Sequence, residues 1–230
     1  MLSLSPSRRR DFEHLDDPGI DPTLRERSLR DVRRANAALG GAHAVLCEVA
    51  RQLSALGSAG TLLDVGTGLG DIPARARALA ARRGVTLTAL GVDEAASLAR
   101  VTHGMLDGSA CADARRLPFP DASVDIVTCS QVLHHFEDAD IPVVLRELQR
   151  VARRAVIVSD LRRSWIAAAG FWIVSWPLGF HPVTRHDGVV SVLRGFTPRE
   201  LSRHVQTATG RAAAVRRHPG FRVTATWSPD

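Results

Sequence analysis

Short apolar segments alternate with helix-like segments along most of this 230-residue chain. The segments typical of buried strands are 61–65, 85–93, 109–113, 123–130 and 154–161. The segments with the spacing and end signals of helices are 71–84, 94–104, 139–153 and 197–210. Such an alternation predicts a parallel sheet that is covered by helices on both faces.

Both ends of the chain add to this sheet. Two strands are predicted in 212–228 around an "HPG" turn, as an antiparallel hairpin at one sheet edge, and two helices in 22–56. We therefore expect an α/β fold with a Rossmann-like, doubly wound sheet of seven strands and an N-terminal helical cap. The expected domains are this cap over 1–57 and a ligand-binding domain over 58–230, with a lid insertion at about 162–195.

The composition narrows the class of protein. The net charge is +6 and the chain has neither lysine nor tyrosine, which excludes a lysine Schiff base and a tyrosine general acid. Because the arginines alternate with acids, as in "LRERSLRDVRR", no nucleic-acid partner is expected. Three scattered cysteines and a start without an apolar leader predict a cytoplasmic protein without disulfides and without a metal site.

One segment, "WIAAAGFWIVSWPLGF" (165–180), is almost entirely apolar. It has 16 residues and a proline, whereas a helix that crosses a bilayer needs about 20 apolar residues. We expect a buried or lid-forming helix here. The alternative is a helix that lies on a membrane surface, because three tryptophans follow two arginines.

The loop in "LLDVGTGLGDIP" (62–73) is the strongest local signal. In an open parallel sheet, ligands bind at the carboxyl ends of the strands, where this loop lies. A dinucleotide site would have the spacing G-x-G-x-x-G, but here it is G-x-G-x-G and Asp71 follows directly. Since a carboxylate would repel a pyrophosphate, the loop favours a ligand without phosphates over a nicotinamide cofactor.

Two further acids follow predicted strands. Asp93 ends the second strand, where a carboxylate can accept hydrogen bonds from both hydroxyls of a ribose. Asp113 ends the third strand, where it could reach an adenine amino group. Together with the loop, these positions predict a site for an adenosine-containing cofactor.

The segments "LLDVGTGLG", "GVDEA", "ADARRLPFPDASVDIVTCSQVLHHF" and "VLRELQRVARRAVIVSDL" resemble the class I S-adenosylmethionine-dependent methyltransferases. The resemblance runs in order over nearly half of the chain. It implies that the glycine loop passes under the methionine part of S-adenosylmethionine, that Asp93 holds the ribose and that Asp113 and Ala114 lie beside the adenine. The cofactor-binding residues so predicted are Asp64, Gly66, Thr67, Gly68, Gly70, Asp93, Asp113, Ala114 and Ser130.

The flanking segments, among them "TRHDGVVSVLRGFTPREL", resemble a narrower bacterial subgroup that is grouped with ubiquinone/menaquinone-type methyltransferases. Members of that subgroup accompany type III polyketide synthases and flavin hydroxylases in pathways to phenolic or quinone lipids. The resemblance implies a small, apolar, aromatic acceptor. Gln131, Arg185 and Trp172 are the predicted acceptor contacts.

Methylation of a phenol also needs a base with a pKa near the working pH, which is usually a histidine. His134 and His135 follow the fourth strand, and we expect His135 to face the cleft. His186, between Arg185 and Asp187, is the second candidate. The alternatives are a packing pair for the first two and a turn with a structural Arg–Asp pair for the third.

The sequence thus predicts an S-adenosylmethionine-dependent methyltransferase that methylates a phenol or hydroquinone oxygen of a small natural product. Methylation of a ring carbon is the runner-up, and a non-catalytic S-adenosylmethionine-binding protein is the alternative from another class. The oligomeric state stays open.

Overall fold

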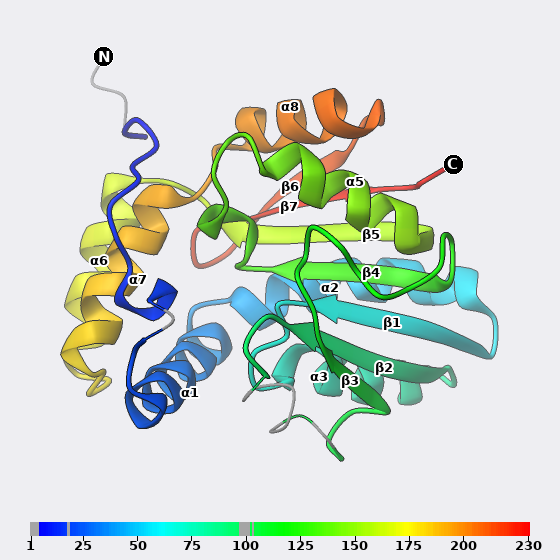
Figure 1. Cartoon of the computed structure of the whole chain (residues 1–230), viewed down its shortest axis with the longest axis horizontal. Coiled ribbons are helices and arrows are strands. Elements are labelled where there is room, and N and C mark those ends of the chain that lie inside the picture. Colours follow the sequence, from blue (N-terminus) through cyan, green and yellow to red (C-terminus); the bar gives the residue numbers. More distant parts are fainter. Residues whose placement is uncertain (1–4, 18, 97–101, 103) are drawn as a thin grey trace.

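The computed structural model describes residues 5–17, 19–96, 102 and 104–230, and in them the predicted seven-stranded sheet is present (Figure 1). Its strands are β1 (Ala59–Val65), β2 (Thr86–Asp93), β3 (Gly108–Cys111), β4 (Val124–Ser130), β5 (Ala152–Leu161), β6 (Ala214–His218) and β7 (Arg222–Trp227). The strand order is β3-β2-β1-β4-β5-β7-β6. Strands β1 to β5 pair in parallel, and β7 runs antiparallel between β5 and β6. The α/β fold class and the C-terminal hairpin are confirmed.

Helices cover both faces of the sheet, as the alternation predicts. On one face α2 (Gly41–Gln52) and α3 (Asp71–Ala81) pack on strand residues such as Leu62 and Ile126. On the other face α5 (Ile141–Val151) and α8 (Pro198–Thr209) pack on the alternate residues, such as Leu63. Since successive strand residues point to opposite faces, the continuous apolar strands supply both cores.

Three helices gather beyond the carboxyl ends of the parallel strands: α1 (Pro22–Ala38), α6 (Trp165–Ser175) and α7 (Pro182–Arg194) (Figure 1). Three short 3₁₀ turns, η1 (His14–Asp16), η2 (Leu53–Leu56) and η3 (Leu133–His135), complete the described elements. Of the predicted N-terminal cap, η1 and α1 lie at this end, whereas α2 packs on the sheet. Most of the helix predicted over 94–104 lies outside the described residues.

Helix α7 corrects one expectation, because the "TRHDG" segment lies inside a regular helix and is not a turn. Local propensity does not favour a helix here, since Gly188 lies near the middle of α7 and is followed by two β-branched valines. The structure shows why glycine stands there: a Cβ at Gly188 would lie 2.1 Å from the Phe171 ring. The glycine therefore lets α7 pack closely on α6.

Helix α6 is apolar on all sides, but only one side is covered. Ala167, Ala168 and Ser175 are buried, whereas Trp172 and Trp176 are about half exposed. No helix among the described residues is long and apolar enough to cross a bilayer. Contact of α6 with a membrane surface stays a prediction.

Candidate functional site

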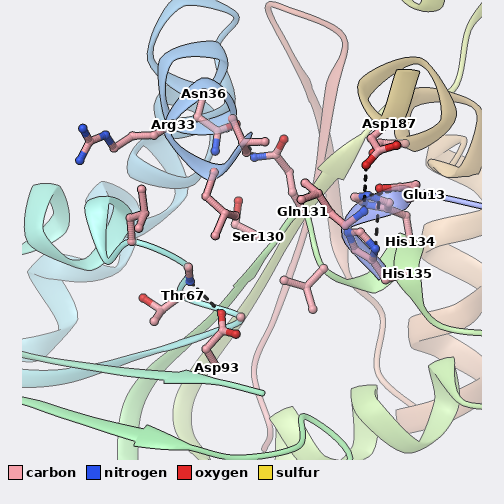
Figure 2. Close-up of a pocket in the computed structure, with 18 of the residues that line it drawn as sticks. Glu13, Arg33, Asn36, Thr67, Asp93, Ser130, Gln131, His134, His135 and Asp187 are labelled. Atoms are coloured by element: carbon pink, nitrogen blue, oxygen red, sulfur yellow. Dashed lines mark hydrogen bonds and ion pairs between the residues drawn. The ribbon is translucent and has the colours of Figure 1, made fainter. Parts of the chain in front are cut away.

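A cavity of about 760 Å³ opens at the carboxyl ends of the parallel strands, within the range of ~300–1,000 Å³ that is usual for small-molecule sites. Its wall combines the glycine loop after β1, the ends of β2, β4 and β5, and residues of η1, α1 and α7. Figure 2 shows two groups of polar side chains at opposite sides of this space. Thr67 and Asp93 mark one end, and Glu13, His134, His135 and Asp187 mark the other.

The glycine loop leaves room for a ligand at the first end. Gly66, Gly68 and Gly70 all have left-handed backbone conformations, which favour glycine. A Cβ at Gly66 would collide with Val132 at 2.2 Å, whereas a Cβ at Gly68 would meet no atom within 4 Å. The Gly68 backbone N–H donates to Asp93 at 2.9 Å, so the loop is fixed against the end of β2. Gly68 therefore borders open space that a bound molecule can fill.

The first end carries an accumulation of carboxylates. Burial, together with the nearby carboxylates of Asp71 and Asp93, raises the pKa of Asp64 to about 7, although Thr128 donates a 2.7 Å hydrogen bond to it. Burial also raises the pKa values of Asp71 and Asp93. This environment would repel a pyrophosphate and favours a cation. S-adenosylmethionine carries positive charge on its sulfonium and ammonium groups, so the residues present fit it.

Of the two residues predicted to lie beside the adenine, Asp113 and Ala114, only one lines the cavity. Ala114 lines the cavity together with Ala112, but Asp113 does not. Arg115 binds both carboxylate oxygens of Asp113 at 2.8 to 3.1 Å, and this hydrogen bonding lowers the pKa of Asp113. The Asp113 side chain is therefore already neutralised outside the cavity wall.

At the other end, His134 forms a dyad with Asp160 at the end of β5. The Nδ1 atom of His134 lies 2.7 Å from the Asp160 carboxylate, which also accepts the His134 and Leu161 backbone N–H groups. Burial opposes the charge on Asp160, but the nearby His134 and these hydrogen bonds hold its pKa below the usual value. An ionised Asp160 fixes the proton of His134 on Nδ1, as in other oriented histidine bases. Its Nε2 is buried without a hydrogen-bond partner among the described residues.

His135 lies beside His134 in a second polar cluster. Its Nδ1 is 2.7 Å from Asp16, and Arg194 reaches both Asp16 at 2.6 Å and Glu13 at 3.0 Å. Burial lowers the pKa of His135, but Asp16 and Glu13 outweigh this effect and raise it overall. Both histidines line the cavity, so the structure brings together the predicted pair. The more exposed His135 is already engaged by Asp16, whereas His134 Nε2 has no hydrogen-bond partner among the described residues and lies 3.9 Å from the Glu13 carboxylate.

Gln131 connects the cavity wall across three elements. It has a left-handed backbone (φ 57°), which is rare for a residue with a side chain and often occurs at functional sites. Its side-chain nitrogen donates to Asn36 of α1, and its oxygen accepts a 2.7 Å hydrogen bond from Arg222 of β7. Ser130, which precedes it, lines the cavity with a buried hydroxyl that has no partner among the described residues.

Three residues of α6 and α7 that were predicted to contact the acceptor or to act as a base do not line the cavity: Trp172, Arg185 and His186. Arg185 stacks on the Trp176 ring at 4.0 Å, Trp172 is 47% exposed, and neither side chain borders the cavity. His186 is half exposed and binds Asp187, which instead of pairing with Arg185 also accepts hydrogen bonds from the N-terminal segment. The helical geometry of α7 explains this, since Asp187 lies on the side of the helix that lines the cavity, whereas Arg185 and His186 lie on another side.

Two groups of donor atoms are close enough to hold a metal ion among the described residues. One group is Glu13, His134 and His135, and the other is His14, His186 and Asp187. In the first group Arg194 already lies beside the Glu13 carboxylate. In the second group both imidazoles contact one Asp187 oxygen at 2.9 Å.

Asp160, Glu13, Arg194 and Arg222 are site residues that the sequence analysis missed. Asp160 had a signal, because it ends the fifth strand, as Asp64 and Asp93 lie at the ends of the first two. The sequence patterns assign no role to the other three. Glu13 and Arg222 line the cavity only through the tertiary fold, and Arg194 pairs with Glu13 without lining it.

Comparisons with known proteins agree with this geometry. Residues 63–158 match the family described as methyltransferase domain. The bifunctional biotin biosynthesis protein BioHC of Cellvibrio japonicus is 33% identical over 115 residues, which are 45% of this chain. The chain spans only 22% of the length of that protein.

Solved structures share the fold. A methyltransferase of Thermotoga maritima has a TM-score of 0.59 at 14% identity, with 90% of this chain and 99% of that chain covered. The magnesium protoporphyrin IX methyltransferase of Synechocystis, crystallised with bound S-adenosylmethionine, has a TM-score of 0.56 at 12% identity, with 94% and 88% covered. At identities this low, the structural similarity shows a common fold and nothing more.

The matched domain, the shared fold and the acid-rich glycine loop agree with one another. The domain match contains the loop, Asp93 and the end of β4, which line the cavity. Residues 63–158 of the chain therefore match a methyltransferase domain, and the chain has the fold of S-adenosylmethionine-dependent methyltransferases of known structure.

Proposed function

We propose that this protein methylates a hydroxyl oxygen of a small, largely apolar aromatic acceptor. The observation that carries the proposal is the His134–Asp160 dyad, at the opposite end of the cavity from the acidic glycine loop. The Nε2 atom of His134 has no hydrogen-bond partner among the described residues. A hydroxyl that is methylated must lose its proton, and an imidazole oriented by a carboxylate is suited to accept it.

The wall at the dyad end supports an apolar acceptor. Leu15, Phe136, Leu161, Phe171 and Val192 contribute apolar side chains to the cavity. Ordinary small-molecule sites have this composition, in which a few polar groups orient an otherwise apolar ligand. Burial of an aromatic ring against these side chains would hold the hydroxyl near His134.

When bound, S-adenosylmethionine supplies an activated methyl group and leaves as S-adenosylhomocysteine. The acceptor oxygen forms the new bond to the methyl carbon, the bond from that carbon to sulfur breaks, and the hydroxyl proton passes to His134 Nε2. Asp160 stabilises the imidazolium that forms. Positioning of the two reactants can lower the barrier by roughly 7–11 kcal/mol, and a general base adds about 10²–10⁴-fold in rate.

The test is transfer of a radiolabelled methyl group to a panel of phenols and hydroquinones at several pH values. His134→Gln should lower the turnover rate by roughly 10²–10⁴-fold and leave S-adenosylmethionine affinity nearly unchanged. Asp160→Asn should also lower the turnover rate, because an asparagine does not fix the proton of His134 on Nδ1. His43→Gln, on the exposed side of α2, is the matched control and should keep full activity.

Three outcomes would overturn parts of the proposal. Activity of His134→Gln within about threefold of the unmodified protein would remove the dyad as the base. A product methylated on a ring carbon would replace O-methylation by C-methylation. Binding of S-adenosylmethionine without turnover on any phenol would favour a non-catalytic role.

A further inference from the structure

Arg222, the first residue of β7, is a buried cation without a counterion. Its side chain lines the cavity, and the residue is only 3% exposed. The single hydrogen bond of its side chain to a described residue runs from Nη1 to the neutral Gln131 amide at 2.7 Å, and its Nε is buried without a partner among these residues. Among the described residues, no carboxylate forms an ion pair with it.

Two other buried arginines show what is usual in this fold. Arg163 pairs with Glu200 at 2.6 Å, and Arg194 pairs with Glu13 and Asp16. Buried charges are normally paired, because desolvation without a partner is costly. Burial lowers the pKa of Arg222 to about 10, and the Asp160 carboxylate only partly opposes this effect. Arg222 therefore remains charged at neutral pH and lacks an anion.

The position of Arg222 assigns it to the dyad end of the cavity. In the sheet, Arg222 pairs with Leu161, the residue that follows Asp160. Gln131 holds Nη1, so the other edge of the guanidinium, with Nε and Nη2, has no hydrogen-bond partner among the described residues. Two parallel N–H groups at one edge match the two oxygens of a carboxylate.

We propose that Arg222 binds a carboxylate of the acceptor, so that the substrate is an aromatic acid rather than a neutral phenol. This inference rests on the proposed function, because it concerns the acceptor of the same cavity. Gln131 is then a positioning residue, because it links the Arg222 guanidinium of β7 to Asn36 of α1.

The probes are benzoate and its neutral isostere benzamide, titrated calorimetrically into protein saturated with S-adenosylhomocysteine. Benzoate should bind at least about tenfold more tightly than benzamide, because charge-assisted hydrogen bonds are about twice as strong as neutral ones. Arg222→Met should abolish the preference, and Arg199→Met, on the exposed side of α8, should retain it. Equal affinities of the two probes in the unmodified protein would overturn the inference.

Two further measurements keep the test decisive. Should Arg222→Met not fold, Arg222→Lys keeps the charge but not the two-pronged geometry, and it should reduce the preference without reversing it. S-adenosylmethionine affinity is measured in the same variants and should stay within about threefold. A loss of cofactor affinity with the benzoate preference retained would assign Arg222 to the cofactor carboxylate and overturn the inference. Failure of the unmodified protein to bind S-adenosylmethionine would instead contradict the proposed function.

A second feature lies on the outside of the molecule, at the uncovered face of α6. Trp165, Ile166, Trp172, Ile173 and Trp176 recur with helical spacing and are 45%, 54%, 47%, 66% and 56% exposed. The helix itself carries no charged residue. Large apolar side chains gathered on one exposed face mark an interaction surface.

Two arginines lie against tryptophans of this face, and one of them, Arg9, also pairs with the exposed Asp11 at 3.4 Å. The Arg9 guanidinium lies 5.2 Å from the Trp165 ring, and Arg185 lies 4.0 Å from the Trp176 ring. The whole chain carries a net charge of +6. Tryptophans and aliphatic side chains flanked by arginines are typical of helices that lie in the interface of anionic membranes.

We infer that the outer face of α6 docks on an anionic lipid surface. Phe171, on the inner side of the same helix, lines the cavity, so docking would place the cavity next to the lipid. The arginines and the exposed apolar side chains of α6 favour an anionic lipid as the partner of this face, whatever ligand Arg222 binds.

The test is sedimentation with phosphatidylcholine vesicles that contain or lack phosphatidylglycerol. The protein should bind the anionic vesicles at least about tenfold more tightly, and Trp172→Ser with Ile173→Ser should abolish binding. Val143→Ser, which removes an exposed valine on α5, should have no effect. Absence of binding to anionic vesicles, or a dimer in solution that the same double variant dissociates, would overturn the inference.

Discussion

Asp64 is a buried acid in the wall of the cavity where we propose that S-adenosylmethionine binds. Its pKa of about 7 lies far above the usual 3.8, mainly because the carboxyl is buried. Between these two pH values the folded state keeps a proton that the unfolded chain has lost. The contribution of Asp64 to the free energy of unfolding therefore falls as the pH rises through this range, and the loss is complete above pH 7.

A positively charged ligand should reverse this loss, because it stabilises the ionised carboxylate. We predict that saturating S-adenosylmethionine raises the melting temperature more at pH 8 than at pH 6, as measured by differential scanning calorimetry. Asp64→Asn should remove most of the difference. Asp107→Asn, at a surface carboxylate whose pKa lies below its usual value, is the control. A ligand effect independent of pH would mean that Asp64 does not respond to the cofactor.

Asp93 is the residue expected to hold the ribose. Its carboxylate already accepts the Gly68 and Ala95 backbone N–H groups, which fix its orientation toward the cavity. Hydrogen bonds to a charged group contribute about 1.5–3 kcal/mol each, so Asp93→Ala should weaken S-adenosylmethionine binding tenfold or more. Titration calorimetry measures this, with the exposed Asp121→Ala as control. Unchanged affinity would remove Asp93 from the site.

At the scale of elements, the glycine loop offers a test that separates strain from binding. Gly68 and Gly84 both have left-handed backbones, and a Cβ at either would meet no atom within 4 Å. Gly68 borders the cavity, whereas Gly84 follows α3 and does not line it.

Valine at either position should strain the backbone by about 1–2 kcal/mol. We predict that Gly68→Val and Gly84→Val lower the melting temperature by similar amounts, but that only Gly68→Val abolishes S-adenosylmethionine binding in titration calorimetry. Normal binding by the Gly68 variant would show that the loop is only a turn. A much larger loss of stability for one variant would show that the pair is not matched.

The elements differ in how well the sequence predicts them. Strands β1, β2, β4 and β5 and the capped helix α8 follow from local signals, such as continuous apolar runs and the Thr197–Glu200 capping box. Helix α7 does not, because its central glycine is explained only by the Phe171 ring of another helix. Tertiary packing here overrides local propensity.

At the scale of the whole molecule, the two ends of the cavity also differ in how well the sequence predicts them. The cofactor end is built by short segments at strand ends, so its loop and acids could be predicted from motifs. The dyad end joins His134 to Asp160 and Gln131 to Arg222, which are 26 and 91 residues apart. These contacts depend on strand order and register, which local patterns do not determine. For the same reason His186 was a plausible base in sequence, yet its side chain does not line the cavity.

A crystal structure of the complex with S-adenosylmethionine tests most directly whether the cofactor and the His134–Asp160 dyad share one cavity. We predict ribose hydroxyls within about 3.2 Å of the Asp93 carboxylate, and a methyl group that points across the cavity toward His134. A ribose held away from Asp93, or a methyl group facing away from His134, would contradict this arrangement.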